Sequence, residues 1–396
     1  MRETPSCIEC GGEAIPHRLT YITVAIDETL RPLFTPGPLT RILSRGLNLL
    51  EKQITPHLFR ALRKIGWARF QESPDERTLL LAKMLWEEAT VRGINVHEVR
   101  LFGLPRNIFL AQLPSGKRLA YEGIPLPIRG REQAWWLDNK AELKKRFTKL
   151  GIPVPKGGAV GSVRGARKLF KELEAPVIVK PYSGSGSRHT TLHITEESAL
   201  IQAFRVAKQV APLVVVEEEL RGPVFRATVV DGVCVGVLRR DPPHVIGNGA
   251  HNIRQLISKA NEHPSRGGPY FSKILLTSAA LAELAWQNLF PHDVPPEGHR
   301  VTLHQKINWS LGGTTADVTD TVHPDNTELF EHIARVLKAP VVGIDFIIGD
   351  MSRSWKSQER CGVIECNSMP FFDNHHLPFE GKPRNVAGAI WDMVTT

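Results

Sequence analysis

Two strand-like segments near the C-terminus constrain the fold and the chemistry of this chain more than any other feature. In residues 341–348 the apolar side chains alternate, which places Asp345 on the face opposite to them. After a polar loop, residues 362–367 carry Glu365 and Asn367 two positions apart and therefore on one face. If the two strands pair, two carboxylates and one amide oxygen converge over a sheet. These are hard oxygen ligands of the kind that Mg²⁺ prefers, together with phosphate oxygens.

The same alternation predicts the buried face of the two strands. Its apolar members are Val342, Ile344, Phe346 and Ile348 in the first strand, with Ile364 and Cys366 in the second. An ordinary hairpin with one polar face has the same spacing. The pattern alone therefore leaves a metal site and a purely structural hairpin as alternatives.

The composition is that of a globular chain and excludes several classes of protein. Hydrophobic residues make up 42% and charged residues 23% of the 396 residues, which excludes a disordered or fibrous chain. The length indicates about two or three packed units. No apolar run reaches the roughly 18 residues that span a bilayer. The N-terminus has no apolar signal core, and five cysteines make no disulfide framework, so we expect a cytoplasmic protein.

The net charge of +9 comes mostly from one segment. Between Arg31 and Phe70 there are eight basic residues and one acid, which accounts for +7 and leaves the rest of the chain nearly balanced. A general nucleic-acid footprint is therefore not indicated. Three interpretations stay open for this segment: solvated basic helices packed on the main body, a surface for an anionic substrate or partner, and a membrane-surface contact.

Two further apolar runs end in residues suited to a nucleotide. Residues 176–180 end at Lys180, and the Gly/Ser loop 183–187 can turn successive backbone N–H groups toward phosphate oxygens. No Gly-Lys-Ser/Thr closes this loop, so it is not a Walker A loop, and a mobile surface loop is the alternative. Residues 213–217 lead into a run of acids. Such a segment can hold a nucleotide base through its backbone and a ribose through a carboxylate, and a solvated strand end is the alternative.

Periodicity predicts the other elements. Helices are expected over 73–93, 138–150, 163–173 and 196–208, strands over 94–101, 107–113 and 117–124, and an antiparallel pair over 224–240 that turns at Asp231-Gly232.

These regions, in this order, resemble the ATP-grasp ligases over roughly residues 138–396. The likeness is greatest to the ATP-grasp module of cyanophycin synthetase, and a second likeness is to that of the fused glutamate–cysteine ligase/glutathione synthetase. The further segments that carry it are 239–249, 253–257, 261–266, 308–320, 322–324 and 377–384.

The resemblance implies ATP and Mg²⁺ as cofactors, with two metal ions and Mn²⁺ as a substitute. The implied ATP-binding residues are the phosphate lysines Lys140 and Lys180, the lid loop Ser185, Gly186, Ser187 and Arg188, and the adenine hinge Glu217 and Leu220. The implied metal ligands are Asp345, Glu365 and Asn367.

The resemblance also implies residues around the transferred phosphoryl group and on the acceptor side. Arg226, Arg240, Lys306 and Asn308 are expected to neutralise charge at the phosphoryl group. His376, Gly381, Lys382 and Arg384 stand where the family closes its acceptor side.

The implied fold class is mixed α+β and α/β, with two α+β subdomains that clasp ATP. The expected domains are a basic helical extension (1–72), a small pre-ATP-grasp α/β domain (73–137), a central lid subdomain (138–215) and a C-terminal metal-binding and substrate subdomain (216–396).

The chain departs from the family pattern in three places. His189 follows the loop arginine where these ligases usually have Gly, and Val224 stands where many place a ribose-binding acid. Phe371 and Phe372 replace a small Pro-Gly-Leu turn, so a different substrate specificity is expected. The likeness ends with the chain, where cyanophycin synthetase continues into a Mur-ligase-like domain, so iterative polymer synthesis is not expected.

The expected activity is that of a carbon–nitrogen ligase, which joins an amino-acid or small-peptide carboxylate to an amine through an acyl phosphate. A phosphotransferase on the same scaffold and a non-catalytic nucleotide-binding module are the alternatives. Expected partners are small amino-acid or peptide substrates and an acidic acceptor, without nucleic acid or a membrane span, in a chain that forms a homo-oligomer.

A Cys-x-x-Cys pair near the N-terminus is half of a zinc site. Cys7 and Cys10 are followed by His17, and no second pair is nearby in the sequence. A small zinc knuckle and an unpaired surface thiol pair are the two interpretations.

Overall fold

The computed structural model describes residues 15–34, 57–126, 134, 136–137, 140–182, 188–268 and 270–396. Within these ranges, no helix combines the length and the apolar character needed to cross a membrane. Cys7 and Cys10, the loop residues Ser185, Gly186 and Ser187, and most of the basic segment lie outside the described residues.

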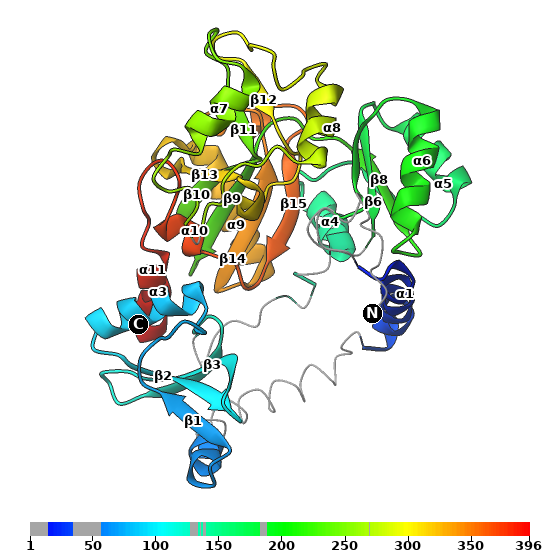
Figure 1. Cartoon of the computed structure of the whole chain (residues 1–396). Coiled ribbons are helices and arrows are strands. Elements are labelled where there is room, and N and C mark those ends of the chain that lie inside the picture. Colours follow the sequence, from blue (N-terminus) through cyan, green and yellow to red (C-terminus); the bar gives the residue numbers. More distant parts are fainter. Residues whose placement is uncertain are drawn as a thin grey trace.

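A five-stranded antiparallel sheet forms the centre of the molecule (Figure 1). We call it the central sheet. In spatial order its strands are β13 (Thr314–Asp317), β10 (Val233–Asp241), β9 (Val224–Val230), β14 (Val341–Ile347) and β15 (Gly362–Asn367). The predicted antiparallel pair is the β9–β10 hairpin, and Asp231 and Gly232 have positive φ at its turn. The predicted strands 341–348 and 362–367 are β14 and β15, which pair with each other.

One face of the central sheet is apolar and packs on α9 (Pro324–Leu337). Proline at the first helical position and His323, whose side chain accepts from the Asp325 backbone N–H, begin this helix. Helical spacing then brings its apolar side chains to the sheet, where Phe330 and Phe346 pack edge to face with ring centroids 5.5 Å apart. Each ring is fully buried, which contributes about 2 kcal/mol per side chain.

A β-bulge corrects one predicted side-chain orientation. Asp345 pairs with Glu365, whereas Phe346 pairs with Val363, so Ile364 has no partner in the register. The extra residue shifts the alternation. Val363 and Cys366 therefore join the apolar core, and the prediction that Ile364 faces it is wrong. Glu365 and Asp345 stay directly opposite each other.

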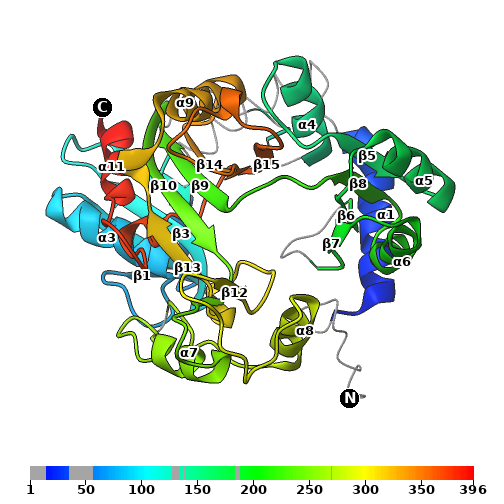
Figure 2. The same cartoon turned by 90° about the horizontal axis from the view of Figure 1, so that it is seen from above.

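A second antiparallel sheet lies beside the central one, and we call it the β5–β8 sheet. In spatial order its strands are β5 (Gly157–Val160), β8 (Val214–Glu218), β6 (Val177–Pro181) and β7 (Thr191–Ile194), and the helices α5 (Val163–Glu172) and α6 (Glu197–Lys208) pack on it. The helix α4 (Lys140–Lys149) stands between the two sheets in both views (Figures 1 and 2).

A small unit, inserted between β10 and β13, has its own apolar core above the central sheet (Figure 1). Its elements are β11 (His244–Ile246), α7 (Ile253–Ala260), α8 (Ser278–Trp286) and β12 (Arg300–Thr302). A capping box formed by Asn252 and Gln255 begins α7. Three 3₁₀ turns follow in the chain: η2 (Trp309–Leu311), η3 (Thr319–Thr321) and η4 (Trp355–Ser357).

An N-terminal sheet packs against the C-terminal helix (Figure 1). Its elements are β1 (Ala68–Gln71), β2 (Asn95–Leu101), β3 (Leu104–Gln112), β4 (Arg118–Glu122) and the helix α3 (Leu80–Val91). The C-terminal elements are α10 (Asp373–His376) and α11 (Val386–Thr395), and the indole of Trp391 donates to the Leu85 carbonyl at 2.9 Å. The helix α1 (His17–Phe34) lies beside the β5–β8 sheet. The four predicted domains and their boundaries stay predictions.

The predicted start of α3 at residue 73 is wrong. The segment before the helix is instead a polar turn, because the Asp75 carboxylate accepts from the Arg77 backbone N–H and the Arg100 guanidinium. The helix begins at Leu80.

Candidate active site

A buried carboxylate on β14 is surrounded by two arginines from neighbouring strands. Register pairs Asp345 with Arg226 on β9. The Arg226 guanidinium donates to both carboxylate oxygens, with Nε–Oδ1 at 2.5 Å and Nη2–Oδ2 at 2.9 Å. Arg240 on β10 lies 3.5 Å from Oδ1. Burial alone would raise the pKa of Asp345, but the charge and hydrogen bonds of Arg226 hold it below the usual value.

Arg240 is the less satisfied of the two cations. Burial lowers its pKa from the ordinary value, and the positive charge of Arg226 opposes the attraction of Asp345. Two guanidinium groups therefore share one buried carboxylate. The charge of Glu365 also acts on both arginines, so the cluster holds the cations Arg226, Arg240 and Lys140 against two carboxylates, and this excess of positive charge favours a further anion.

Glu365 and Asn367 lie on the same face as Asp345. Glu365 is paired in register with Asp345, and Asn367 with Gly343. The Lys140 ammonium on α4 is 3.5 Å from Glu365 Oε2, and the glutamate side chain is 35% exposed. The three predicted metal ligands are thus brought to one end of one sheet face.

The donor set fits a magnesium ion that also binds phosphate. In the described ranges, no group of three or more His, Cys, Asp or Glu side chains is arranged around a common point. Asp345 and Glu365 supply two carboxylates and Asn367 an amide oxygen. Mg²⁺ keeps several ligands from water and substrate phosphates, so an all-protein cage is not required.

The β5–β8 sheet contributes a second charged cluster. The buried Glu217 carboxylate on β8 is in contact with the ammonium groups of Lys180 on β6 and Lys144 on α4. Burial alone would raise the pKa of Glu217, but the two lysines lower it. Burial, with the charge of Lys180, lowers the pKa of Lys144 to about 8. The predicted adenine contact of Glu217 stays a prediction.

Lys144 is a site residue that sequence reasoning missed. It follows Lys140 by four residues, so the two side chains lie on one helix face. This spacing is the signal that could have found it. The Lys140 charge acts on both Asp345 and Lys144, which places it electrostatically between the two clusters. The helix α4 therefore joins the two sets of charges into one site.

Other predicted residues have local roles in the structure. Asn308 caps η2, because its Oδ1 accepts from the Ser310 backbone N–H at 2.9 Å. Lys306 is in the loop before that cap, and its backbone N–H donates to His304 Nδ1 at 2.9 Å. Leu220 follows β8, and Arg188 lies in the turn before β7. Their contacts with a nucleotide stay predictions.

Three of the four acceptor-side residues, Gly381, Lys382 and Arg384, lie at a separate pair of acids. Arg384 contacts Asp317 at 2.7 Å and Asp320 at 2.9 Å, and Lys382 contacts Asp320 at 2.8 Å. Gly381 has φ +88°, and a Cβ there would lie 2.9 Å from the Asp317 carbonyl. His376 Nε2 accepts from the Ala387 backbone N–H at 3.0 Å. In this structure these residues fix the segment 377–384 against β13.

The two predicted departures at 189 and 224 have clear local structures. His189 adopts φ 53°, the left-handed region that favours glycine, and its side chain is fully buried. Its ring contacts the His17 ring edge to face with centroids 4.7 Å apart, which ties α1 to this turn. Val224 begins β9 and is half-buried.

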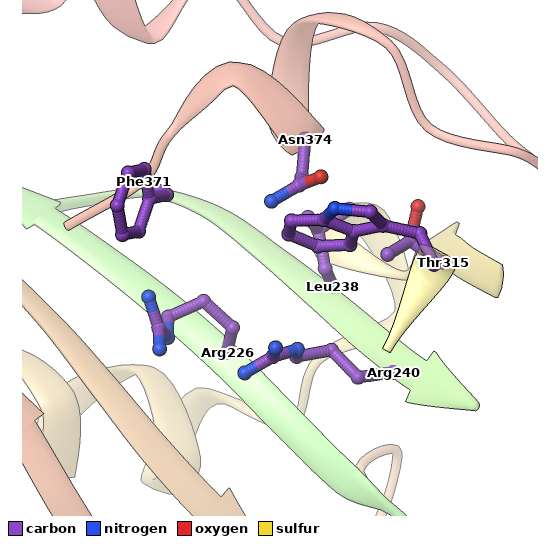
Figure 3. A pocket seen from close by; sticks show the side chains of 7 residues that line it. Arg226, Leu238, Arg240, Thr315, Phe371 and Asn374 are labelled. Carbon is purple, nitrogen blue, oxygen red and sulfur yellow. The ribbon is translucent and has the colours of Figure 1, made fainter. Parts of the chain in front are cut away.

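A pocket opens over the two arginines (Figure 3). Its empty volume is about 300 Å³, part of it open to solvent. The residues that line it are Arg226, Leu238, Arg240, Trp309, Thr315, Phe371 and Asn374. Of the two aromatics predicted to alter specificity, Phe371 is 66% exposed and lines the pocket, whereas Phe372 is fully buried in the core beneath α11.

The fold is that of the ATP-grasp ligases, as predicted. A bifunctional glutathione synthetase from Pasteurella multocida superposes with a TM-score of 0.59 and 24% identity, over 80% of this chain and 43% of that one. No family model matches the chain.

Curated relatives agree with this assignment. Cyanophycin synthetase of Trichormus variabilis is 34% identical over 262 residues, which cover 65% of this chain and 29% of the relative. The glutathione biosynthesis bifunctional protein GshAB of Clostridium perfringens is 30% identical over 264 residues, or 65% of this chain and 34% of the relative. The predicted likeness to both enzymes is confirmed. The matched part of the chain spans about a third of the length of these relatives.

Proposed function

We propose that this chain is an ATP- and Mg²⁺-dependent ligase that joins a carboxylate to an amine through an acyl phosphate. The observation that carries the proposal is the single charged site built from both sheets. Asp345 and Glu365 face one another on the central sheet, and Lys144 and Lys180 converge on the facing sheet. Lys140 acts electrostatically on both groups.

ATP would bind with its phosphates between the two clusters. Lys140, Lys144 and Lys180 are the ammonium groups available to the phosphate oxygens, and Glu217 holds two of them in place. Asp345, Glu365 and Asn367 would hold Mg²⁺, which supplies charge neutralisation between the phosphates when it is bound. Because Arg226 contacts both oxygens of Asp345, it must share that carboxylate with the metal.

The chemistry requires positioning and charge more than a nucleophilic side chain. A carboxylate oxygen of the substrate attacks the γ-phosphorus of ATP, and ADP leaves. The amine then attacks the acyl phosphate, and phosphate leaves as the amide forms. Arg226 and Arg240 would neutralise the transferred group, and each such donor is worth about 3 kcal/mol, or roughly 100-fold in rate.

The acceptor side has weaker structural support. Lys382 and Arg384 are the two cations predicted for the acceptor side. In the structure Lys382 forms an ion pair with Asp320 and Arg384 with Asp317. Amino acids or small peptides fit as substrates. An acidic acceptor, a homo-oligomer and a cytoplasmic location stay predictions.

The test is an ADP-release screen over pairs of amino acids, with mass spectrometry of the product. We expect Lys180→Ala and Glu365→Ala each to lower turnover at least about 100-fold, because the first removes a cation at the phosphates and the second removes a ligand of the metal. Lys168→Ala is the matched control, since that lysine side chain is 79% exposed on α5. Circular dichroism should show an unchanged fold in all three variants.

The screen also separates the alternatives. Phosphate release that requires an amine supports a ligase, whereas a stable phosphorylated acid would indicate a phosphotransferase. Normal ATP turnover in Lys180→Ala or Glu365→Ala would refute the site. No Mg²⁺-dependent ATP hydrolysis with any amine would favour a non-catalytic nucleotide-binding module.

A further inference from the structure

The rim of the pocket presents an exposed aromatic ring on a fixed segment. Phe371 is 66% exposed, while the adjacent Phe372 is fully buried in the core formed with α11. Single exposed apolar side chains are common on protein surfaces. Phe371 differs because it lines a pocket whose other members include two arginines (Figure 3).

A buried histidine holds this rim to the strand that carries Arg226. His375 is fully buried on α10, and its Nε2 is 2.8 Å from Thr228 Oγ1 on β9, two residues after Arg226. The ring lies against Gly236, where a Cβ would be 2.6 Å from His375 Nδ1. The segment that carries Phe371 and Asn374 is therefore fixed relative to the arginines.

The second aromatic residue of the pocket, Trp309, also lies on an anchored backbone. Trp309 lies in η2, which Asn308 caps. The Trp309 carbonyl accepts from the backbone N–H groups of Ser272 at 3.1 Å and Gly312 at 3.0 Å. Gly312 has φ 95°, so the turn that carries the indole depends on glycine. Aromatic side chains that are fixed before a ligand binds lose little conformational freedom on binding.

The pocket also has a place for an anion. Arg226 donates to both oxygens of Asp345. Within the described part of the chain, the ion pair of Arg240 is the longer 3.5 Å contact with the same carboxylate. A carboxylate that enters the pocket would form an ion pair with Arg240. The positive charges of Arg226 and Arg240 favour its binding.

We propose that this pocket binds the acid substrate, and that the acid carries a bulky apolar or aromatic group. Its carboxylate lies against Arg240, and its apolar group packs on Phe371 and Trp309. The inference rests on the proposed ligase function, since a carboxylate next to these arginines is the one positioned to receive the phosphoryl group. Phe371 and Trp309 are thus specificity-determining residues.

Hydroxylamine trapping tests the inference without knowledge of the natural amine. Hydroxylamine converts an acyl phosphate into a hydroxamate, so the assay reports activation of the acid alone. We expect kcat/KM for N-acetyl-L-phenylalanine to exceed that for N-acetylglycine by at least about tenfold, as apolar pockets allow. Phe371→Ala and Trp309→Ala should each reduce this ratio several-fold, chiefly through KM, and Phe371→Leu should preserve most of it.

The control separates this role from a general effect of losing an exposed ring. Phe290 is 58% exposed and does not line the pocket, so Phe290→Ala should leave the ratio unchanged. Equal kcat/KM values for N-acetyl-L-phenylalanine and N-acetylglycine would overturn the inference while the ligase function stands. An unchanged ratio of these values in both Phe371→Ala and Trp309→Ala would do the same.

A binding measurement covers the case in which no acid is activated. Calorimetric titration with N-acetyl-L-phenylalanine alone does not depend on catalysis. Saturable binding that weakens in Phe371→Ala supports the pocket even if the proposed function fails. Absence of such binding, together with absence of turnover, would refute both the proposed acid-binding pocket and the proposed ligase function.

Discussion

At the scale of single residues, the site is a set of buried charges that neutralise each other. Burial of an unpaired charge costs several kcal/mol, so each buried group needs a partner. Asp345 has Arg226, and Glu217 has Lys144 and Lys180. A bound nucleotide would exchange these internal pairs for pairs with phosphate and metal.

We expect Lys144 to make the proposed ATP binding sensitive to pH. Its pKa of about 8 lies below the ordinary value of 10.5, because burial and the charge of Lys180 disfavour the ammonium form. The group is therefore charged at pH 7 and loses its charge as the pH rises through about 8. We expect the Kd for ATP to be higher at pH 9 than at pH 7.

The measurement is a titration of ATP at both pH values. Arginine keeps its charge throughout this range, so Lys144→Arg should flatten the dependence. An equal pH dependence in the wild-type chain and in Lys144→Arg would show that another group is responsible.

At the scale of elements, α4 connects the two halves of the site. Its apolar side chains Leu143 and Phe147 belong to the core of the central sheet. Its lysines contact β15 through Lys140 and β8 through Lys144. One helix therefore packs on the central sheet and contacts both charged clusters.

A second connection joins β7 to α8. His193 on β7 is 2.7 Å from Glu219, and its ring stacks on Trp286 with centroids 4.5 Å apart. We expect Trp286→Ala to loosen this contact, so that amide hydrogens of residues 188–194 exchange faster while those of α6 keep their protection. Hydrogen exchange with mass spectrometry measures both.

Phe290→Ala is the matched control for that experiment, because it removes an exposed ring from the same unit. Its exchange pattern around β7 should equal that of the wild-type chain. Equal exchange in Trp286→Ala would mean that the stacked pair does not restrain β7.

The sequence predicted an element correctly where the element depends on a pattern of neighbouring residues. Alternation predicts β14 and places Asp345 opposite the apolar face, as the structure has it. The bulge at Ile364 could not be predicted, because it depends on how β14 and β15 pair and has no signal in the sequence of either strand. The start of α3 was wrong because the Asp75 turn is stabilised by Arg100, a partner 25 residues away.

The site was predictable to a similar extent. Spacing alone places Glu365 and Asn367 on one face, and the pairing of β14 with β15 brings Asp345 to it. The pairing of Glu217 with Lys144 joins residues 73 positions apart and arises from how α4 packs between the sheets. The order of motifs indicated the fold, but it could not show that Lys382 and Arg384 would pair with Asp317 and Asp320.

At the scale of the whole molecule, the central sheet, α4, the β5–β8 sheet and the inserted α7–α8 unit follow one another around the molecule when it is seen from above (Figure 2). The N-terminal sheet lies apart from this site and packs on α11 through the shared core around Trp391. The similarity to an ATP-grasp enzyme covers 80% of the chain, so it extends beyond the residues in which the sequence motifs occur.

We expect Asp345, Glu365 and Asn367 to bind magnesium together with the phosphates of ATP. The most direct measurement is calorimetric titration of ATP with and without Mg²⁺, in the wild-type chain, in Glu365→Gln and in the control Asp350→Asn, whose acid is exposed. We predict that Mg²⁺ tightens ATP binding at least about tenfold, or about 1.4 kcal/mol, in the wild-type chain and the control. The gain should disappear in Glu365→Gln, while binding of metal-free ATP to the lysines is retained; an undiminished gain in Glu365→Gln would contradict the account.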